Sequence, residues 1–149
     1  MLFTLLGCSW QFVNFAGPYP DNMVRGGIDS DGTVIYIGRA FHEGDMLPAK
    51  VMPDKQAAFV CYGGGEHFKE DFEVLRSGNF VWEFATGGTI PEGGVACGQT
   101  ADGELLYVGR ALYQGSQTPG KIQVSHGCLY IPFGGEEVSV TEYEVLCLK

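Results

Sequence analysis

One stretch of this sequence occurs twice, and that duplication limits the possible folds more than any other feature. Residues 35–40 read IYIGRA, and residues 106–111, 71 positions later, read LYVGRA. Each copy is followed by a polar link and a Pro-x-Lys turn, at residues 48–50 and 119–121. Self-similarity at a fixed spacing is the signature of a fold assembled from copies of one structural unit.

The duplication extends over nearly the whole chain. With the same offset, residues 20–75 align without a gap onto residues 91–146, and about a third of the positions are identical. The repeats are therefore about 8–78 and 79–149. A glycine-rich unit of this size buries little apolar surface alone. We expect the two repeats to pack as one domain, residues 1–149, related by a pseudo-twofold axis.

Composition and turn signals predict an all-β fold. The chain contains 23 Gly and 7 Pro, and the dipeptides at 31–32 and 102–103 are Asp-Gly. Asp-Gly between apolar runs is a hairpin signal. The runs that follow alternate between two faces, as strands do, and no window keeps a helical period free of Gly or Pro. We expect four to five short antiparallel strands in each repeat.

Charge and cysteine content narrow the cellular setting. The net charge is −9, which disfavours nucleic acid as a partner, and no basic run favours insertion into a membrane. The five cysteines form no metal-binding motif and are interpreted as free thiols. The apolar start, residues 1–8, is interpreted as an edge or swapped strand, or as part of a leader. A cytoplasmic location, or secretion without a conventional signal peptide, follows.

No pattern indicates catalysis or a cofactor. The three histidines, His42, His67 and His126, have no histidine at the equivalent position of the other repeat. Hydrolase, zinc-protease and phosphate-loop motifs are absent from the sequence. The turn at residues 29–32 resembles the start of a calcium loop but lacks the remaining ligands, so an Asx-type turn is the better interpretation. We expect a non-enzyme with no metal.

Two repeated arginines lie inside apolar runs. Arg39 and Arg110 occupy the same place in each repeat, and a half-buried guanidinium requires a partner. Two pairs of repeated carboxylates are available, Glu73 with Glu144 and Glu66 with Glu137. We expect each arginine to form an internal Arg–Glu contact.

The repeated lysines allow two interpretations. Lys50 and Lys121 each follow a Pro-containing turn and could be solvated turn residues or fixed donors to a polar ligand. Asp29 is the natural carboxylate partner in the first repeat, where the second has Thr100. A carboxylate and an ammonium a few ångströms apart suit a sugar, because the carboxylate accepts from two hydroxyls while the ammonium donates.

The ordered motifs resemble the DM-nine repeat family. The pattern runs from Pro20-Asp21-Asn22 through the Tyr-Ile-Gly-Arg-Ala run and Gly-(x)3-Pro-(x)-Lys to Glu73-Val74-Leu75, and less completely from Pro91 to Leu146. The resemblance implies a duplicated all-β domain that recognises mannose without a metal ion. It places the recognition residues at Asp29 and Lys50, and it implies a homodimer that exchanges edge strands. The second repeat keeps Lys121 but not the aspartate.

We predict a lectin for mannose or mannosylated glycans on microbial surfaces, acting in pattern recognition and innate immunity. Asn22, Glu66 and Lys121 are secondary candidates for sugar contacts, and Trp10, Tyr36 and Tyr19 are candidates to cover the sugar's apolar face. The alternative is a non-lectin cytosolic interaction protein that uses the same scaffold. No nucleic acid or cofactor is expected in either case.

Overall fold

The computed structural model describes residues 8–149 and confirms an all-β fold made from two matching sets of seven strands. The first set is β1 (Cys8–Asn14), β2 (Arg25–Ile28), β3 (Val34–His42), β4 (Asp45–Met52), β5 (Ala57–Tyr62), β6 (Gly65–Phe68) and β7 (Asp71–Ser77). The second is β8 (Phe80–Thr86), β9 (Ala96–Gln99), β10 (Leu105–Tyr113), β11 (Ser116–Gln123), β12 (Cys128–Phe133), β13 (Glu136–Val140) and β14 (Glu142–Leu148). Single 3-10 turns, η1 (Pro53–Lys55) and η2 (Val124–His126), complete the two sets.

Each repeat contains more strands than the four to five expected. The difference lies in the short strands β2 and β6 and their counterparts β9 and β13, because the apolar pattern of the sequence does not distinguish them from the neighbouring strands. The interpretation of residues 1–7 as an edge strand or a leader lies outside the described residues. Within residues 8–149, no helix is long and apolar enough to cross a membrane.

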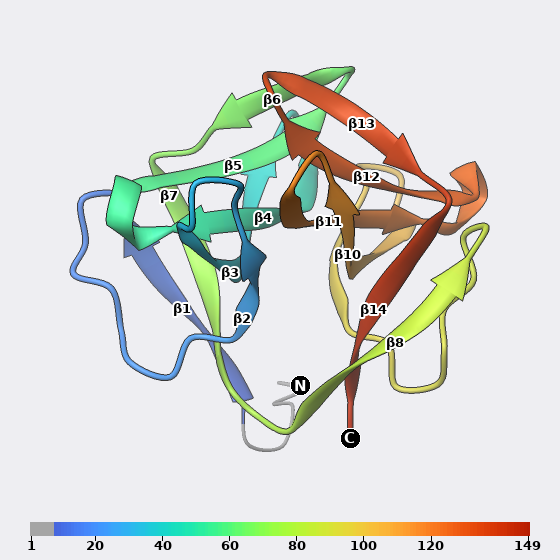
Figure 1. Ribbon diagram of the computed structural model, residues 1–149, viewed down its shortest axis with the longest axis horizontal. Coiled ribbons are helices and arrows are strands. Elements are labelled where there is room, and N and C mark those ends of the chain that lie inside the picture. The colour runs from blue at the N-terminus through green and yellow to red at the C-terminus, as the bar shows by residue number, and fades with distance from the viewer. Residues whose placement is uncertain (1–7) are drawn as a thin grey trace.

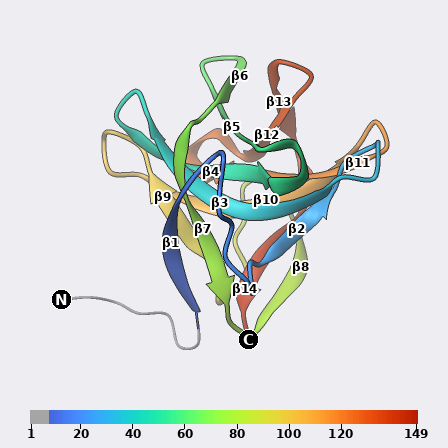
Figure 2. The same ribbon diagram turned by 90° about the vertical axis from the view of Figure 1, so that its left-hand side faces the viewer.

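Six strands from both repeats form a closed ring. The pairing order is β3, β2, β11, β10, β9 and β4, and β4 pairs back onto β3. The two places where the ring passes between repeats are equivalent: Ile28 pairs with Gln117, and Met46 pairs with Gln99. Each repeat therefore completes the other's sheet, and Figures 1 and 2 show the two sets of strands interlocked about the centre of the molecule.

Three extensions leave this ring. β7 and then β1 continue from β3, and β14 and then β8 continue from β10. The third extension runs from β4 through β5, β6, β13 and β12 to β11, so that the β6–β13 pair joins the repeats a third time. β1 and β8 end the sheet as its edge strands and lie on opposite sides of the molecule (Figure 1).

Besides a small cluster of Ile35, Met52 and Ala57, the apolar interior has one cluster mainly within each repeat and another shared between them. The first two clusters centre on Val51 and Val74 and on Ile122 and Val145. The shared cluster packs Ile37 and Leu75 of the first repeat against four residues of the second, which are Val95, Cys97, Val108 and Leu146. Removing one repeat would expose this third cluster to water.

The duplicated IYIGRA run forms the centre of each repeat. β3 pairs with β2, β4 and β7, and its glycine is required by close packing. A Cβ at Gly38 would lie 2.6 Å from Val51 Cγ2 and 2.7 Å from the Glu73 carbonyl oxygen. At the equivalent Gly109, a Cβ would lie 2.7 Å from Ile122 Cδ1. The glycine of the motif therefore allows the central strand of each repeat to pack closely against its neighbours.

Candidate functional site

The two arginines form the internal contacts expected of them. Arg39 Nε donates to Glu73 Oε1 over 2.8 Å, and its guanidinium lies 4.1 Å from the centre of the Trp10 ring. Its Nη1 donates to the Cys97 carbonyl of the other repeat. Arg110 matches each contact, with Glu144, Trp82 and the Gly26 carbonyl. Of the two carboxylate pairs left open by the sequence, Glu73 and Glu144 are the partners.

The other two carboxylates pair with the repeated lysines. Lys50 Nζ lies 2.7 Å from Glu66 Oε2, and Lys121 Nζ lies 2.9 Å from Glu137 Oε2. The four side chains are 7–12% exposed. We call these two contacts the axial ion pairs. Each lies within one repeat, and its two residues also form hydrogen bonds with the backbone of the other repeat. The interpretation of Lys50 and Lys121 as solvated turn residues is wrong.

Contacts across the repeats hold the axial ion pairs in place. Lys50 Nζ donates to the Pro132 carbonyl over 2.7 Å, and Lys121 Nζ donates to the equivalent Cys61 carbonyl over 3.0 Å. The carboxylate of Glu66 also accepts from the backbone N–H of Gly135, which belongs to the turn between β12 and β13. Glu137 accepts in the same way from Gly64. Each buried charge therefore has both an opposite charge and a backbone partner, which buried ions require.

Aromatic rings flank each axial ammonium. Lys50 Nζ lies 5.5 Å from the centre of the Phe59 ring and 5.9 Å from that of Phe133. Lys121 Nζ lies 5.5 Å from Tyr130 and 5.6 Å from Tyr62. One ring of each set comes from the same repeat as its lysine and the other from the opposite repeat. An ammonium, a carboxylate and ring faces are thus brought together twice.

Asp29 is not the ion-pair partner of Lys50 that the sequence suggested. It lies in the turn between β2 and β3, where its carboxylate accepts from the Ser30 N–H and is 3.8 Å from Lys55 Nζ. The stronger contact of Lys55 is with Asp31, at 2.7 Å. This contact, with hydrogen bonds from Thr33, holds the pKa of Asp31 well below its usual range. The local hydrogen bonds agree with an Asx-type turn, and the role of Asp29 in sugar binding stays a prediction.

The remaining candidates are dispersed. Asn22 lies in an exposed turn with a φ of 63°, and its carbonyl accepts from the Ser77 N–H. Trp10 covers Arg39, and Tyr19 packs against Phe72, so both rings serve the structure. Tyr36 packs against the first core cluster. Within residues 8–149, no hydrogen bond or ion pair joins any of these side chains to Asp29 or Lys50.

Burial limits the reactivity of the cysteine side chains that the structure describes. The cysteines with described side chains are Cys61, Cys97, Cys128 and Cys147, and all are buried and unpaired. Burial raises the pKa of Cys97 to about 12, far from the value that a nucleophilic thiolate needs. In the described part of the chain, no three His, Cys, Asp or Glu residues are grouped to hold a metal ion.

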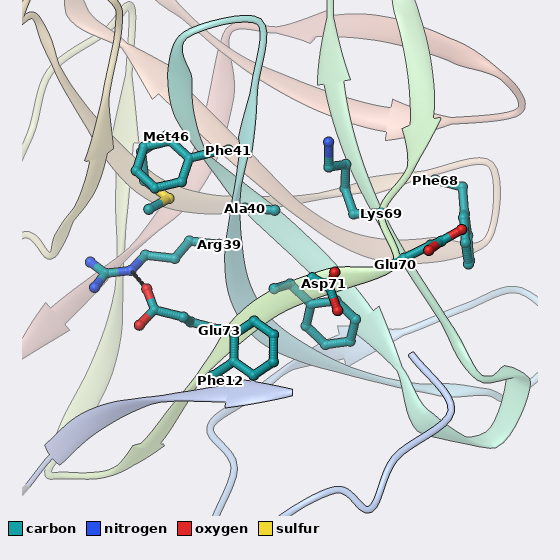
Figure 3. Close-up of a pocket in the computed structure, with 11 residues that line it drawn as sticks. Phe12, Arg39, Ala40, Phe41, Met46, Phe68, Lys69, Glu70, Asp71 and Glu73 are labelled. Atoms are coloured by element: carbon teal, nitrogen blue, oxygen red, sulfur yellow. Dashed lines mark hydrogen bonds and ion pairs between the residues drawn. The ribbon is translucent and has the colours of Figure 1, made fainter. Parts of the chain in front are cut away.

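No sequence motif indicates the groove that lies on the outer face of the first repeat. It has a volume of about 680 Å³ and lies between β3, β1 and the connection from β6 to β7. Figure 3 shows Phe41 and Met46 on one side, Phe68 and Glu70 on the other, and Phe12 below, with the Arg39–Glu73 pair at one end. The wall residues are far apart in sequence, which explains why no motif marks the groove.

A cluster of histidine and lysine borders the groove. Lys69, which lines it, has its Nζ 3.3 Å from His42 Nδ1, and the rings of His42 and His67 stack at 4.4 Å. Sequence reasoning set these histidines aside because the other repeat does not match them. They meet because the end of β3 and the strand β6 lie together in the fold.

Comparison with known proteins defines the class as a duplicated all-β domain of repeat type. The family model described as the DM9 repeat matches residues 29–140, about three quarters of the chain. The chain belongs to the DM9 repeat family. It is also 31% identical to Natterin-4 of Thalassophryne nattereri over 141 residues, which cover 91% of this chain and 33% of Natterin-4.

A solved structure has the same fold. The nematode sperm cell motility protein MFP2B superposes with a TM-score of 0.74 at 16% identity, covering 95% of this chain and 46% of that chain. At this identity the likeness shows the fold alone. The chain spans about a third of the length of Natterin-4 and just under half of the MFP2B chain.

Proposed function

We propose that this chain is a metal-independent, non-enzymatic lectin domain that binds mannose or mannose-containing glycans. Membership of the DM9 repeat family and the relationship to Natterin-4 support a lectin-like role in binding carbohydrate. The structural observation that carries the proposal is the first axial ion pair, where an ammonium, a carboxylate and two aromatic rings are fixed beside one another.

The chemistry of this pair suits a neutral sugar. Lys50 Nζ uses two of its three N–H groups on Glu66 and the Pro132 carbonyl, which leaves one for a ligand oxygen. Each carboxylate oxygen of Glu66 has one protein partner, and its remaining lone pair can accept a hydrogen bond from a sugar hydroxyl. The rings of Phe59 and Phe133 supply apolar faces of the kind that pack against sugar C–H groups. Lys121 and Glu137 repeat the arrangement in the second half of the chain.

Asp29 is the polar group that distinguishes the first repeat. Its carboxylate is held in the turn before β3, and its side chain is 18% exposed. Thr100 at the equivalent place removes one acceptor and one negative charge from the second repeat. In the proposed site, Asp29 accepts from hydroxyls of the glycan, and the first repeat binds more strongly than the second.

We extend the proposal to the biological setting. The partners are mannosylated glycans on microbial surfaces, and the role is pattern recognition in innate immunity, in the cytoplasm or after unconventional secretion. A homodimer would raise the effective affinity for clustered glycans, because the second binding event becomes intramolecular.

Calorimetric titration with mannose and a high-mannose glycan tests the proposal. Asp29→Asn keeps the acceptor for Ser30 but removes the charge, and we expect it to weaken binding at least tenfold. The matched control is Asp102→Asn, an exposed turn aspartate of the second repeat, which should bind as the wild type does. Wild-type protein that does not bind mannose, or equal effects of the two substitutions, would contradict the proposal.

The lysine is better tested without substitution, because Lys50 also stabilises the fold. The ε-methylene signals of Lys50 and Lys121 can be followed by NMR during the mannose titration. We expect the Lys50 signals to shift with the same dissociation constant that calorimetry gives. Binding of mannose with no movement of either signal would place the sugar elsewhere.

One observation favours the alternative, a non-lectin interaction protein. Phe12 and its counterpart Phe84 are 65% and 67% exposed, and Phe41 and its counterpart Leu112 are 68% and 79% exposed. Contiguous apolar surface is typical of protein contacts, and Phe12 and Phe41 both line the groove of the first repeat. Under this alternative, partners captured from cytosol would be insensitive to added mannose and would be lost in a Phe41→Ser variant.

A further inference from the structure

We infer that His42, His67 and Lys69 form a binding site for a compact oxyanion: a sulfate, a phosphate or a carboxylate. This site lies beside the groove of the first repeat and takes a charged group, so it is separate from the proposed site for neutral mannose. The inference does not depend on the lectin function.

The geometry provides converging donors. Lys69 Nζ donates to His42 Nδ1, so the ring proton of neutral His42 is on Nε2. His67 Nε2 donates to the Tyr62 carbonyl over 2.9 Å, which fixes the orientation of the second ring. The two rings stack with an interplanar angle of 25°. An anion at this place would receive hydrogen bonds from the remaining N–H groups of Lys69, and from the Nδ1–H of His42 once that ring is protonated.

Within residues 8–149, Lys69 is one of four Lys and Arg side chains that form no ion pair with a carboxylate. Five Lys and Arg side chains form ion pairs within residues 8–149, and these are Arg39, Lys50, Lys55, Arg110 and Lys121. The sequence has 18 acidic and 9 basic residues, so a lysine whose recorded side-chain partner is a histidine is unusual in this chain. A positive group without an opposite charge is what an anion site requires.

Other charges nearby reduce this positive potential, and three carboxylates, Glu70, Asp71 and Glu73, line the groove beside Lys69. Glu43 and Asp45 are the carboxylates that act on His42. Glu43 is exposed, and Asp45 already accepts from the backbone N–H of Ala101 over 2.8 Å. Tyr62 also packs against the His42 ring, edge to face.

The fold itself does not require these residues. The equivalent positions of the second repeat hold Tyr113, Val138 and Val140, and Tyr113 packs edge to face on Phe133. An apolar cluster therefore satisfies the same place in the same topology. The fold therefore does not need His42, His67 and Lys69, because the second repeat forms the same strands with apolar residues at these positions.

A ligand can reach the cluster. Lys69 lines the groove of about 680 Å³, and its ammonium lies at the upper edge in Figure 3, across from Phe41. A volume in this range accommodates a small ligand. An anionic group bound to Lys69 could therefore belong to a larger molecule that occupies the groove.

Binding should depend on pH. Burial, with the charges of Lys69 and His67, lowers the pKa of His42 from its ordinary value. When His42 gains a proton, Nδ1 can no longer accept from Lys69, and both cations become available to an anion. A bound anion favours the charged form of His42, so affinity should rise as the pH falls and the anion should raise the His42 pKa.

The experiment is an NMR titration with sodium sulfate at pH 5.5 and 7.5, at constant ionic strength. The Cε1–H signals of His42 and His67 should shift saturably, more strongly at pH 5.5, while the signal of His126 in the other repeat stays unchanged. Lys69→Gln should weaken sulfate binding at least tenfold. Lys149→Gln removes an exposed lysine at the chain terminus and is the matched control. Non-saturable shifts, equal binding at both pH values, or wild-type affinity in Lys69→Gln would overturn the inference.

Further titrations with glucuronate, glucose and acetate separate the sources of the anion. Glucuronate and neutral glucose differ by one carboxylate. Tighter binding of glucuronate than of acetate, with no binding of glucose to the cluster, would assign the site to acidic sugars. Equal binding of acetate, glucuronate and sulfate would support a site for the anionic group alone. Wild-type protein that binds mannose but does not bind sulfate would refute this site without affecting the proposed lectin function.

Discussion

The axial ion pair of the first repeat gives the sharpest test of how the two halves are held together. We predict that Lys50→Met strongly destabilises the protein. The substitution has a similar length and no charge, so it leaves the Glu66 carboxylate, 10% exposed, without its ammonium. It also removes the donor to the Pro132 carbonyl of the other repeat.

The expected cost follows from what remains buried. Removing one partner of a buried ion pair costs about 3–5 kcal/mol, because the other charge stays uncompensated. Glu66 keeps its hydrogen bond from Gly135, which favours the lower part of that range. A domain of this size is stable by about 5–15 kcal/mol. One substitution should therefore remove a large fraction of the total.

Equilibrium unfolding in urea measures this cost, and a double-mutant cycle isolates the pair. Lys50→Met with Glu66→Gln should be less destabilised than the sum of the single variants, by about 1 kcal/mol or more. Lys121→Met should match Lys50→Met, since its pair is equally buried. A loss below about 1 kcal/mol in Lys50→Met, or additive effects in the cycle, would show that the contact is not a buried, coupled ion pair.

Three further predictions concern single sites. Gly120→Ala should destabilise the fold by about 1–3 kcal/mol in the same assay, because the added Cβ would lie 2.0 Å from the Tyr130 carbonyl oxygen. The equivalent residue of the first repeat is Ala49, which is buried there. Wild-type stability of the Gly120→Ala variant would contradict this packing. In native protein at pH 8, Cys97 should resist alkylation in peptide mass mapping, because burial raises its pKa to about 12, and rapid labelling would count against the described core. The lowered pKa of His42 means that the folded state favours the neutral ring, so its contribution to stability is present above about pH 6.5 and is lost as the pH falls through the folded-state pKa; His42→Gln should flatten that part of the stability profile, and an unchanged slope would refute the assignment.

Local features were predictable because they depend on residues close in the sequence or matched between repeats. The duplication and the hairpin turns could be found by inspection. The contacts of Arg39 with a repeated glutamate could be narrowed to two choices, because a guanidinium inside an apolar strand needs a carboxylate. The register of β3 against β7 places Arg39 opposite Glu73, and this register determines which of the two glutamates pairs with the arginine.

Contacts between the repeats could not be predicted in the same way. Lys50 pairs with Glu66, whose own position depends on the meeting of β6 with β13, a single pair between Glu136 and Gly65. No sequence pattern specifies that pairing. Asp29 seemed the nearer partner because both residues flank the same strand, yet its turn places it beside η1 and Lys55. The histidine cluster was missed for the same reason, since the fold alone joins residues 42 and 67.

The two repeats differ where they are free to differ, and this bears on where function lies. The axial lysines, their glutamates and the arginine contacts are the same in both halves, because each half supplies a backbone partner for the other. Replacing one of these charged residues would leave its ion-pair partner without an opposite charge and would break a contact with the other repeat. Positions outside this network have no such constraint. Asp29 stands opposite Thr100, and Lys69 opposite Val140. The proposed ligand contacts of Asp29 and Lys69 both fall in the first repeat, at places where the second repeat folds without the same chemistry. Exchanging Thr100 for Asp should therefore leave stability unchanged in urea unfolding and, if the lectin proposal holds, strengthen binding to clustered mannose through a second site.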